Sequence, residues 1–592
     1  MQKEIQPNTS QEYQSLDNIV LCLSGGGYRA ALFHLGAMSY LERLNLLNNV
    51  RILSTVSGGS FPGMLYALYK SINLPFSEVY NDLIAFTRNN TLIEETLEKL
   101  TSSSEKQDLI LLFADFYHKN LLQQAKFEEL WKLTPQGEND KFLRNVIFNA
   151  IELVNGLAFR FHYQGKYVGD PLSYSGNNYL RIPEEKVKQV RLADILAASS
   201  GFPGGFEPLL IDRELMEIEV LHPQVQHEVV VGLMDGGIID NQGLDAAFRA
   251  VVRDEFPEKY SAFNQMDNTE FAESIVDLIN DQNSSKNKKQ RENFFIEAKE
   301  AQSKIIDKYT YIISDVDSYY LRPFRNADYN KKFFTNLNFN WIFILFHVFI
   351  ITILGLSVKT FSSLDWQESF TFSTIFTLGV VVVLLLFNQL VIRKLFKKVP
   401  VVGAKAWPML RSMPLFKILY LIRQRIFSLT TVVGGVFLKE IRRNVYKQLF
   451  GKERFKHRRI SNLITDLIQK DVTRRQKELE KENIGSHPVF QKIYNPSESI
   501  ISTATRAFNT GTTFWFDKEE LNNNKIEDLV SAGQFTMCFN LLEHLCRQFP
   551  EVDDTHQFFH ILSIARKDWD HFNEDPTFLF NDLKSDSAEP VA

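Results

Sequence analysis

The feature that most constrains this 592-residue chain is a short apolar run that ends directly in a glycine-rich turn, and it occurs twice near the beginning. Residues 19–23 run into Ser24 and three glycines, and residues 51–56 run into Ser57. Each run has the length of a buried strand, and each is followed by the apolar spacing of a helix. The sequence therefore predicts an α/β fold for this part of the chain.

The first turn contains Gly25, Gly26 and Gly27 and is suited to binding an anionic oxygen. Backbone N–H groups in such a loop point outward without obstruction by a Cβ, near the start of a helix. They can stabilise the negative oxygen of a tetrahedral intermediate, and Arg29 can fix the loop or favour the anion. The spacing fits neither a dinucleotide-binding motif nor a P-loop. Taken alone, the loop is equally well explained as a tight turn.

Ser57 lies where the second strand meets its helix, which is the place of the serine in a nucleophile elbow. The usual elbow has glycine two residues before and two residues after the serine. Gly59 fills the second position, but Thr55 replaces the first, and its Cβ would crowd the turn. The alternative is that Ser57 is a helix N-cap. Beside the glycine loop, we favour the nucleophile.

A third apolar run, residues 229–234, ends in Asp235, which precedes Gly236 and Gly237. An aspartate at such a strand end can serve as the base that a nucleophilic serine needs. The alternative is an ordinary turn aspartate, which is the interpretation we prefer for Asp240. None of the twelve histidines lies in a sequence context typical of a catalytic triad. Because a carboxylate is a weak base at its usual pKa, contact with the serine hydroxyl must supply much of the effect.

These segments resemble the motifs of patatin-like phospholipases in type, order and separation. Two more segments agree with that family: residues 197–203, before the aspartate, and residues 311–317, after it. The resemblance covers about residues 18–325. It implies a three-layer α/β/α domain, a Ser57–Asp235 dyad, an oxyanion hole from the glycine loop, and hydrolysis of lipid acyl esters. It requires no metal and no organic cofactor.

We therefore expect a membrane-associated serine acyl hydrolase of the phospholipase A or lysophospholipase class, with membrane lipid as its substrate. The competing hypothesis is a catalytically silent membrane scaffold that uses the patatin fold to bind lipid or a protein partner. Ser57 and Asp235 argue against the scaffold, and Thr55 is the one motif residue that argues for it.

Two apolar runs, residues 341–358 and 374–392, contain no Asp, Glu, Lys or Arg. As helices, each would be about 27–28 Å long at ~1.5 Å per residue, which is enough for a thin hydrocarbon core. They predict a two-helix transmembrane hairpin inserted in the hydrolase, and the alternative is a pair of buried helices. Basic residues flank both outer ends, which predicts that the catalytic domain and the C-terminal region are cytoplasmic. The polar start and three cysteines fit this prediction, with no signal peptide and no disulfide framework.

Residues 393–460 hold 18 Lys and Arg against Glu440 and Glu453, although the whole chain has a formal charge of −5. A basic region beside a membrane span is expected to attract anionic lipid headgroups. The alternative, to which we give nearly equal weight, is a helix packed on the hydrolase with a solvated basic face. No recognised nucleic-acid-binding module accompanies the charge, so we expect no nucleic acid partner.

The sequence thus predicts five parts in chain order. Residues 500–506 and 512–516 are expected to be late strand-like pieces that complete the hydrolase. The parts are a catalytic domain at 18–335, a hairpin region at 338–392, the basic region at 393–460, a mostly helical C-terminal region at 461–550, and an acidic tail at 551–592.

Overall fold

The computed structural model describes the glycine loop, the segment around Ser57 and the segment around Asp235. The chain divides into two units, Met1–Tyr320 with Glu440–Ala592, and Leu321–Lys439. The described residues are 16–89, 91–102, 108–133, 142–165, 174–177, 180–212, 215, 217–218, 230–255, 308–316, 338, 341, 348, 412–430, 438–450, 455, 457–482, 493–548 and 558–586.

The first unit is built on one mixed sheet, in which β11, β10, β1, β2 and β3 are parallel neighbours. The sheet continues through antiparallel pairs to β4, β5, β6 and β8, while β9 pairs antiparallel with both β3 and β7. The strands are β1 Ile19–Leu23, β2 Val50–Val56, β3 Asn145–Glu152, β4 Ala158–Gln164, β5 Tyr174–Gly176, β6 Leu180–Pro183, β7 Leu209–Asp212, β8 Glu217–Ile218, β9 Val230–Asp235, β10 Thr310–Asp315 and β11 Arg459–Leu463.

Helices separate and follow these strands in the chain. They are α1 Gly27–Arg43, α2 Ser60–Ser71, α3 Phe76–Arg88, α4 Leu92–Ser102, α5 Leu109–Asn120, α6 Glu184–Val187, α7 Leu192–Ser200, α8 Leu244–Glu255, α15 Leu415–Thr430, α16 Leu438–Phe450, α17 Gln469–Glu482, α19 Glu498–Asn509, α20 Lys518–Asn522, α21 Lys525–Gln548, α22 Phe559–Glu574 and α23 Phe578–Asp586.

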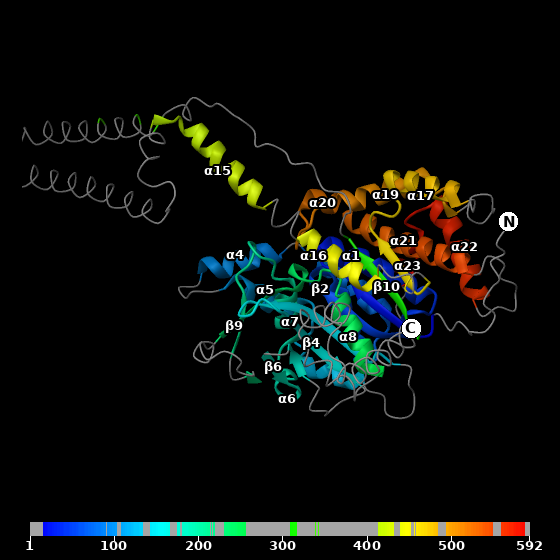
Figure 1. Cartoon of the computed structure of the whole chain (residues 1–592), viewed down its shortest axis with the longest axis horizontal. Helices are drawn as coiled ribbons and strands as arrows, with labels where there is room; N and C mark the ends of the chain where they lie inside the picture. Colours follow the sequence, from blue (N-terminus) through cyan, green and yellow to red (C-terminus); the bar gives the residue numbers. More distant parts are fainter. Residues whose placement is uncertain are drawn as a thin grey trace, which may run out of the picture. The chain divides into compact units, whose positions relative to one another are not determined.

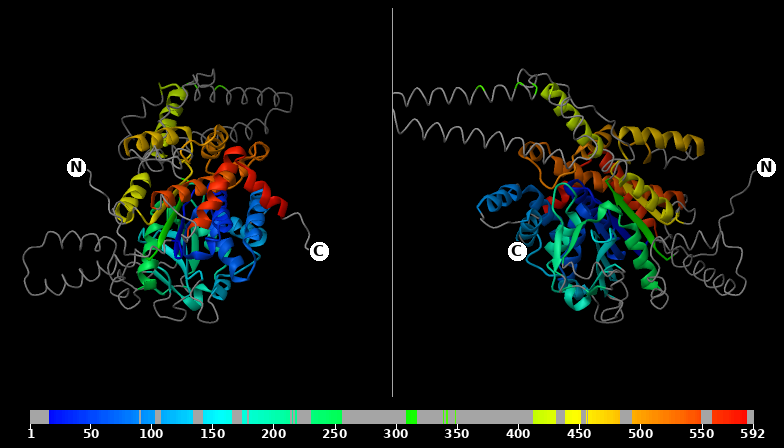
Figure 2. Two further views of the ribbon diagram at one scale, coloured as in Figure 1. Left: turned by 90° about the vertical axis from the view of Figure 1, so that its right-hand side faces the viewer. Right: turned by 60° about the vertical axis from the view of Figure 1, so that its left-hand side comes forward.

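The central strands β1, β2, β3 and β10 are buried at every position because helices cover both faces of the sheet. In β1, Ile19, Leu21 and Leu23 belong to one buried cluster, which also contains residues of α1, α2, α7 and α21. Val20 and Cys22 belong to a second cluster, on the opposite face, with residues of α8 and α16. Successive side chains of a strand point to opposite faces, so a parallel strand buried on both faces becomes a continuous apolar run. Two further views show the sheet between these helices (Figure 2).

The sequence-based strand predictions around the glycine turns are confirmed. Residues 19–23 form β1, residues 51–56 lie within β2, and residues 229–234 largely coincide with β9. The run at 311–317 corresponds to β10, which pairs with β1. The helices predicted after the first two turns are α1 and α2. The α/β character of the domain therefore follows from local patterns alone.

The C-terminal helices belong to the same unit as the sheet, and α21 packs along α1 (Figure 1). The two helices approach so closely that side chains are excluded at the contact. A Cβ at Gly36 would lie 2.0 Å from the carbonyl oxygen of Val530, and a Cβ at Gly533 would lie 2.0 Å from that of Phe33. Two glycines thus permit backbone-to-backbone packing between segments from opposite ends of the chain.

The prediction of late strand-like pieces is wrong. Residues 500–506 lie in the helix α19, which begins at the N-cap Ser497 and buries Ile500, Thr503, Ala504 and Ala507. That spacing is helical, and burial of one helical face outweighs the local strand preference of the β-branched residues. Residues 512–516 form no strand, although they lie close to the glycine loop, as described below.

The prediction of an inserted transmembrane hairpin, and with it of an integral-membrane protein with two spans and cytoplasmic domains, is corrected. None of the helices that the structure describes is both long and apolar enough to cross a membrane. α21 has 24 residues but carries charged side chains such as Asp528 and Glu543, and α15 has 16 residues and includes Arg423. Of the runs 341–358 and 374–392, residues other than 341 and 348 lie outside the described ranges.

Replacing Gly533 by alanine should destabilise the whole first unit. The added methyl group meets the backbone of α1 and forces the helices apart, which we expect to cost about 1–3 kcal/mol of unfolding free energy. Gly511→Ala is the matched control, because a Cβ there meets nothing within 4 Å. Denaturant unfolding of both variants measures the difference. Equal stability of the two variants would contradict the close packing of α1 and α21.

Candidate active site

The register of β3 brings Ser57 and Asp235 together. Val56, the last residue of β2, pairs with Asn149 of β3, and Asp235, the last residue of β9, pairs with the next residue, Ala150. Ser57 follows Val56 directly, so the serine and the aspartate lie at adjacent strand ends on one edge of the sheet. Both residues are buried. The structure therefore assembles the two residues that the sequence predicts as nucleophile and base.

Ser57 has the backbone conformation of a strained turn. Its φ is +50°, in the left-handed region that residues other than glycine rarely adopt. The turn is held in place by Ser199, whose hydroxyl accepts a hydrogen bond from the Ser57 amide at 3.1 Å and donates to the carbonyl of Asn149 at 2.8 Å. Strain of this kind, fixed by neighbouring hydrogen bonds, is typical of a nucleophile elbow.

The Asp235 carboxyl is placed to accept the proton of the serine. It accepts a hydrogen bond from the amide of Gly237 at 2.7 Å. Burial raises the pKa of Asp235 to about 6, and interactions with the Ser57 hydroxyl, the Gly237 amide and the charge of Arg442 offset part of that rise. The amide of Asp235 donates to the carbonyl of Gly201 at 3.0 Å, which fixes the strand end.

The glycine loop approaches the elbow from β1, and its amides differ in what they bind. The Gly25 amide donates to the carbonyl of Asn241 at 3.0 Å and is therefore occupied. Gly26 and Gly27 have φ of +151° and +61°, and within the described part of the chain their amides make no hydrogen bond to a backbone carbonyl. A Cβ at Gly58 would lie 2.1 Å from the carbonyl oxygen of Gly27, so loop and elbow are in backbone contact.

The other predicted site residues support this geometry. A Cβ at Gly59 would lie 2.5 Å from the carbonyl oxygen of Leu23, and one at Gly236 would lie 2.6 Å from that of Asn149, so both glycines allow close packing against strand ends. The Arg29 guanidinium donates to the carbonyl of Thr510 at 3.2 Å and ties the helix after the loop to the C-terminal region.

Three residues of the site could not be recognised as such from the sequence. Ser199 lies in the motif at 197–203, which marked the segment but not the residue that contacts the elbow. Asn241 fixes the Gly25 amide, and its only signal was its place in a turn. Thr513 lies in the segment 512–516, which was expected to complete the domain as a strand, but nothing marked its contact with the loop: its carbonyl accepts from the amide of Tyr28 at 2.7 Å, across 485 residues of chain.

The described residues contain no group of three or more His, Cys, Asp or Glu that could hold a metal ion. Within the same residues, no hydrogen bond joins a histidine to Ser57 or Asp235. His34, the histidine on the helix after the loop, instead contacts the backbone of Ser24 and the hydroxyl of Ser314.

Comparison with known families identifies the arrangement. The model of the family described as patatin-like phospholipase matches residues 21–248. This range contains the glycine loop, the elbow and Asp235. Residues 21–248 form a patatin-like phospholipase domain. The match supports a lipid acyl hydrolase in general. No curated protein matches the chain significantly.

The patatin-like domain accommodates Thr55 at the elbow through a second glycine. A Cβ at Gly63, on α2, would lie 2.5 Å from Cγ2 of Thr55, so the missing side chain leaves room for the threonine methyl group. The Thr55 hydroxyl is bonded to that of Ser60 at 3.0 Å and donates to the carbonyl of Ile147 at 3.3 Å. In the usual elbow, a glycine on the strand leaves this space free. Here Gly63, on the helix that faces the strand, leaves room for the side chain of Thr55.

The packing of the Thr55 methyl group against Gly63 predicts that the two residues are energetically coupled. Gly63→Ala alone should lower the unfolding free energy by about 1–3 kcal/mol, because its methyl group overlaps Cγ2. Thr55→Ser removes that methyl group and keeps the hydroxyl, so the double variant should be more stable than the sum of the single effects. Denaturant unfolding of the four proteins measures the coupling. Strictly additive effects would show that the two side chains do not share this space.

Proposed function

We propose that the patatin-like domain is a serine acyl hydrolase of the phospholipase A or lysophospholipase type, in which Ser57 is the nucleophile and Asp235 the base. The observation that carries the proposal is the placement of Ser57, in a strained strand-to-helix turn, beside the buried carboxyl of Asp235 at the neighbouring strand end. A buried hydroxyl next to a buried carboxylate is arranged for proton transfer.

In the proposed acylation, Oγ of Ser57 attacks the carbonyl carbon of the ester while Asp235 takes the hydroxyl proton. The carbonyl oxygen becomes an oxyanion and accepts hydrogen bonds from the amides of Gly26 and Gly27, the two loop amides with no backbone carbonyl partner among the described residues. The ester C–O bond then breaks. Asp235 returns the proton to the departing alkoxide, which leaves the acyl group on Ser57.

In the proposed deacylation, the same groups act on water. Asp235 accepts a proton from the water as its oxygen attacks the acyl carbon, and the loop amides again stabilise the oxyanion. The bond to Ser57 breaks, Oγ recovers the proton from Asp235, and the free fatty acid leaves. The cycle requires neither a metal ion nor an organic cofactor.

An aromatic cluster beside the elbow supports an acyl chain as the substrate group. Phe61 follows the elbow, and its ring packs on Tyr28 at a centroid distance of 5.7 Å and on Tyr117 at 5.3 Å. At the border of the cluster, Phe202 stacks on Phe514 at 5.9 Å and is 44 % exposed. Phe61, Tyr28 and Tyr117 are fully buried, whereas Phe202 offers exposed apolar surface, and we infer that the acyl chain approaches along Phe202.

The second unit supports a lipid aggregate as the source of that substrate. α15 presents exposed Lys417, Arg423 and Arg425 together with exposed Leu419 and Ile426. A helix that combines exposed basic and apolar side chains is suited to the surface of anionic lipid. We propose that this part of the basic region 393–460 binds anionic headgroups, and that binding weakens as salt is added.

Substitution of the dyad should abolish ester hydrolysis without unfolding the protein. Ser57→Ala removes the nucleophile and Asp235→Asn removes the proton acceptor, and each should lower kcat/KM by roughly 10⁴-fold or more. Ser71→Ala, a buried serine on α2 whose hydroxyl donates to the carbonyl of Leu68, is the control and should keep parental activity. Turnover of a p-nitrophenyl ester and labelling by a fluorophosphonate probe measure the effects. A parent protein that neither turns over esters nor reacts with the probe would favour the silent scaffold.

The activity should fall on the acid side with an apparent pKa near that of Asp235. The carboxyl acts as a base only when it is ionised, and burial raises its pKa to about 6, so kcat/KM should decline tenfold per pH unit well below pH 6 and level off above it. Burial also raises the pKa of Asp240 to about 6. Asp240→Asn therefore serves as the control and should leave the midpoint unchanged. Movement of the midpoint in this variant would assign the titration to Asp240 instead.

A further inference from the structure

The peptide group between Ser24 and Gly25, which begins the glycine loop, is held from both sides. Its N–H donates to the carbonyl of Asn241 at 3.0 Å, and its carbonyl lies 3.0 Å from Nε2 of His34. The plane of this peptide sets the direction in which the chain continues into Gly26 and Gly27. Whatever fixes His34 therefore also fixes the amides that we assign to the oxyanion.

The hydrogen bonds around His34 have one consistent direction. A carbonyl oxygen can only accept, so the contact with Ser24 places the imidazole proton on Nε2. Nδ1 is then an acceptor, and it lies 2.8 Å from Oγ of Ser314, which must donate to it. Burial lowers the pKa of His34 to about 3, so the ring is neutral at ordinary pH and keeps this single proton.

Ser314 lies on β10, and its hydroxyl is oriented in turn by the C-terminal region. The amide of Asn462, on β11, donates to Oγ of Ser314 at 3.0 Å, and the side-chain carbonyl of Asn462 accepts from the amide of Asn540 at 3.3 Å. Asn540, on α21, also donates to the carboxylate of Asp466 at 2.9 Å. Each member of this chain of hydrogen bonds thus has a defined donor and a defined acceptor, which favours a single arrangement.

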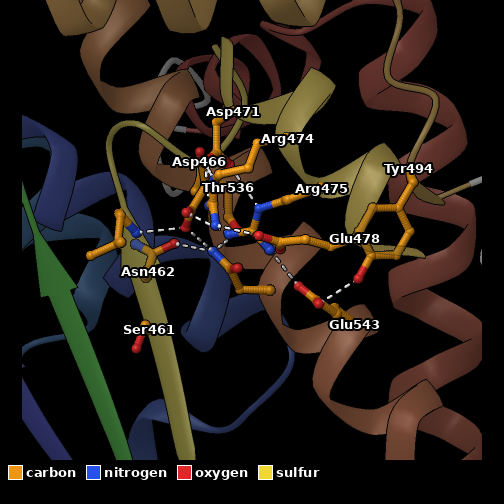
Figure 3. A network of polar contacts seen from close by, with 12 residues as sticks. Ser461, Asn462, Asp466, Asp471, Arg474, Arg475, Glu478, Tyr494, Thr536 and Glu543 are labelled. Atoms are coloured by element: carbon orange, nitrogen blue, oxygen red, sulfur yellow. Dashed lines mark hydrogen bonds and ion pairs between the residues drawn. The ribbon is translucent and has the colours of Figure 1, made fainter. Parts of the chain in front are cut away.

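This series of hydrogen bonds, which starts at His34, ends at an ionic cluster in the C-terminal region (Figure 3). Arg475 donates to Asp466 at 2.6 Å, to Asp471 at 2.7 Å and to Glu543 at 2.7 Å. These groups are largely buried, and the three carboxylates surround one guanidinium. Removal of one partner from such a cluster leaves an uncompensated charge, so its geometry is rigid.

We propose that His34 is a positioning residue for the oxyanion loop, and that it transmits the geometry of the C-terminal cluster to the loop through Asn462 and Ser314. The proposal rests on the function assigned above, because it gives the loop amides a catalytic purpose. Its members Ser314, Asn462 and Asn540 lie outside the segment that the family model matches. The ionic cluster around Arg475 then contributes to catalysis without itself contacting the substrate.

Two isosteric substitutions separate the bonds of His34. In His34→Gln, the side-chain amide nitrogen takes the place of Nε2 and can still donate to the carbonyl of Ser24. In His34→Asn, the side-chain oxygen takes the place of Nδ1 and can still accept from Ser314, but the bond to the loop is lost. Each variant is neutral, as His34 is, and each loses the contacts of one ring nitrogen: Nδ1 with Ser314, or Nε2 with the carbonyl of Ser24 and, at 3.4 Å, its hydroxyl.

The proposal predicts that the two variants have similar melting temperatures and different activities. With a short p-nitrophenyl ester, kcat of His34→Asn should fall by about 10- to 100-fold, because displaced oxyanion donors act in the transition state. His34→Gln keeps the bond to the loop but loses the link to Ser314, so its kcat should fall by only about 2- to 10-fold, as in Ser314→Ala. KM should change little in both variants, since the substrate contacts remain.

Hydrogen exchange of the loop gives a readout that does not depend on turnover. The amides of Gly25 and Tyr28 are hydrogen-bonded in the structure, and they should exchange faster in His34→Asn than in His34→Gln. Ser39→Ala, on the same helix and bonded to Gln534 of α21, is the control and should alter neither exchange nor kcat. Should His34→Asn fail to fold, Ser314→Ala removes the donor to Nδ1 and should lower kcat by about 2- to 10-fold with faster loop exchange.

Equal kcat and equal loop exchange in His34→Asn and His34→Gln would overturn the inference. A parent protein without esterase activity would instead overturn the proposed function, and the exchange comparison would still decide whether His34 fixes the loop. A fall of kcat in Ser39→Ala as large as in His34→Asn would reduce the effect to general destabilisation and would also refute a positioning role.

Discussion

The register of β3 is the constraint on which the candidate site depends. β3 pairs with β2 through Asn149 and with β9 through Ala150, so a parallel and an antiparallel neighbour meet on consecutive residues of one strand. The serine follows the first neighbour and the aspartate ends the second. Backbone pairing with β3 thus places Ser57 and Asp235 side by side, although they lie far apart in the sequence. A shift of one residue in β3 would turn its side chains to the opposite face and separate the dyad.

The same sheet depends on helices that lie far beyond the segment matched by the family model. α21 contacts α1 where Gly36 and Gly533 leave no room for side chains, and the Thr513 carbonyl accepts from the amide of Tyr28 in the first turn of α1. The helix that starts at the glycine loop is therefore fixed by C-terminal backbone near its start and near its middle. Because the loop amides lead into that helix, their direction depends on residues from both ends of the chain. The C-terminal helices beyond the matched segment therefore belong to the same compact unit as the sheet.

Much of the fold and the two central residues of the site could be predicted from the sequence because their signals are local. A short apolar run followed by glycine defines a strand end, and the side chain that follows it lies at the edge of a sheet. The partners of those residues could not be predicted, because Ser199 and Asn241 are selected by contacts across the sheet. The strand predicted at 500–506 failed because burial of Ile500 and Ala504 on one helical face outweighs local β-propensity. The hairpin was inferred from apolar composition alone, and no described helix bears it out.

The burial of Asp235 supports the proposal of a serine–aspartate dyad without a histidine. An exposed aspartate has a pKa near 4 and is a poor base for a hydroxyl. Burial raises the pKa to about 6, which strengthens the base by about two orders of magnitude, while the Ser57 hydroxyl and the Gly237 amide keep the carboxyl largely ionised at neutral pH. More burial or fewer hydrogen bonds would protonate the base, and less burial would weaken it. The strand end that holds Asp235 in this balance is therefore as necessary to the proposed chemistry as the carboxylate itself.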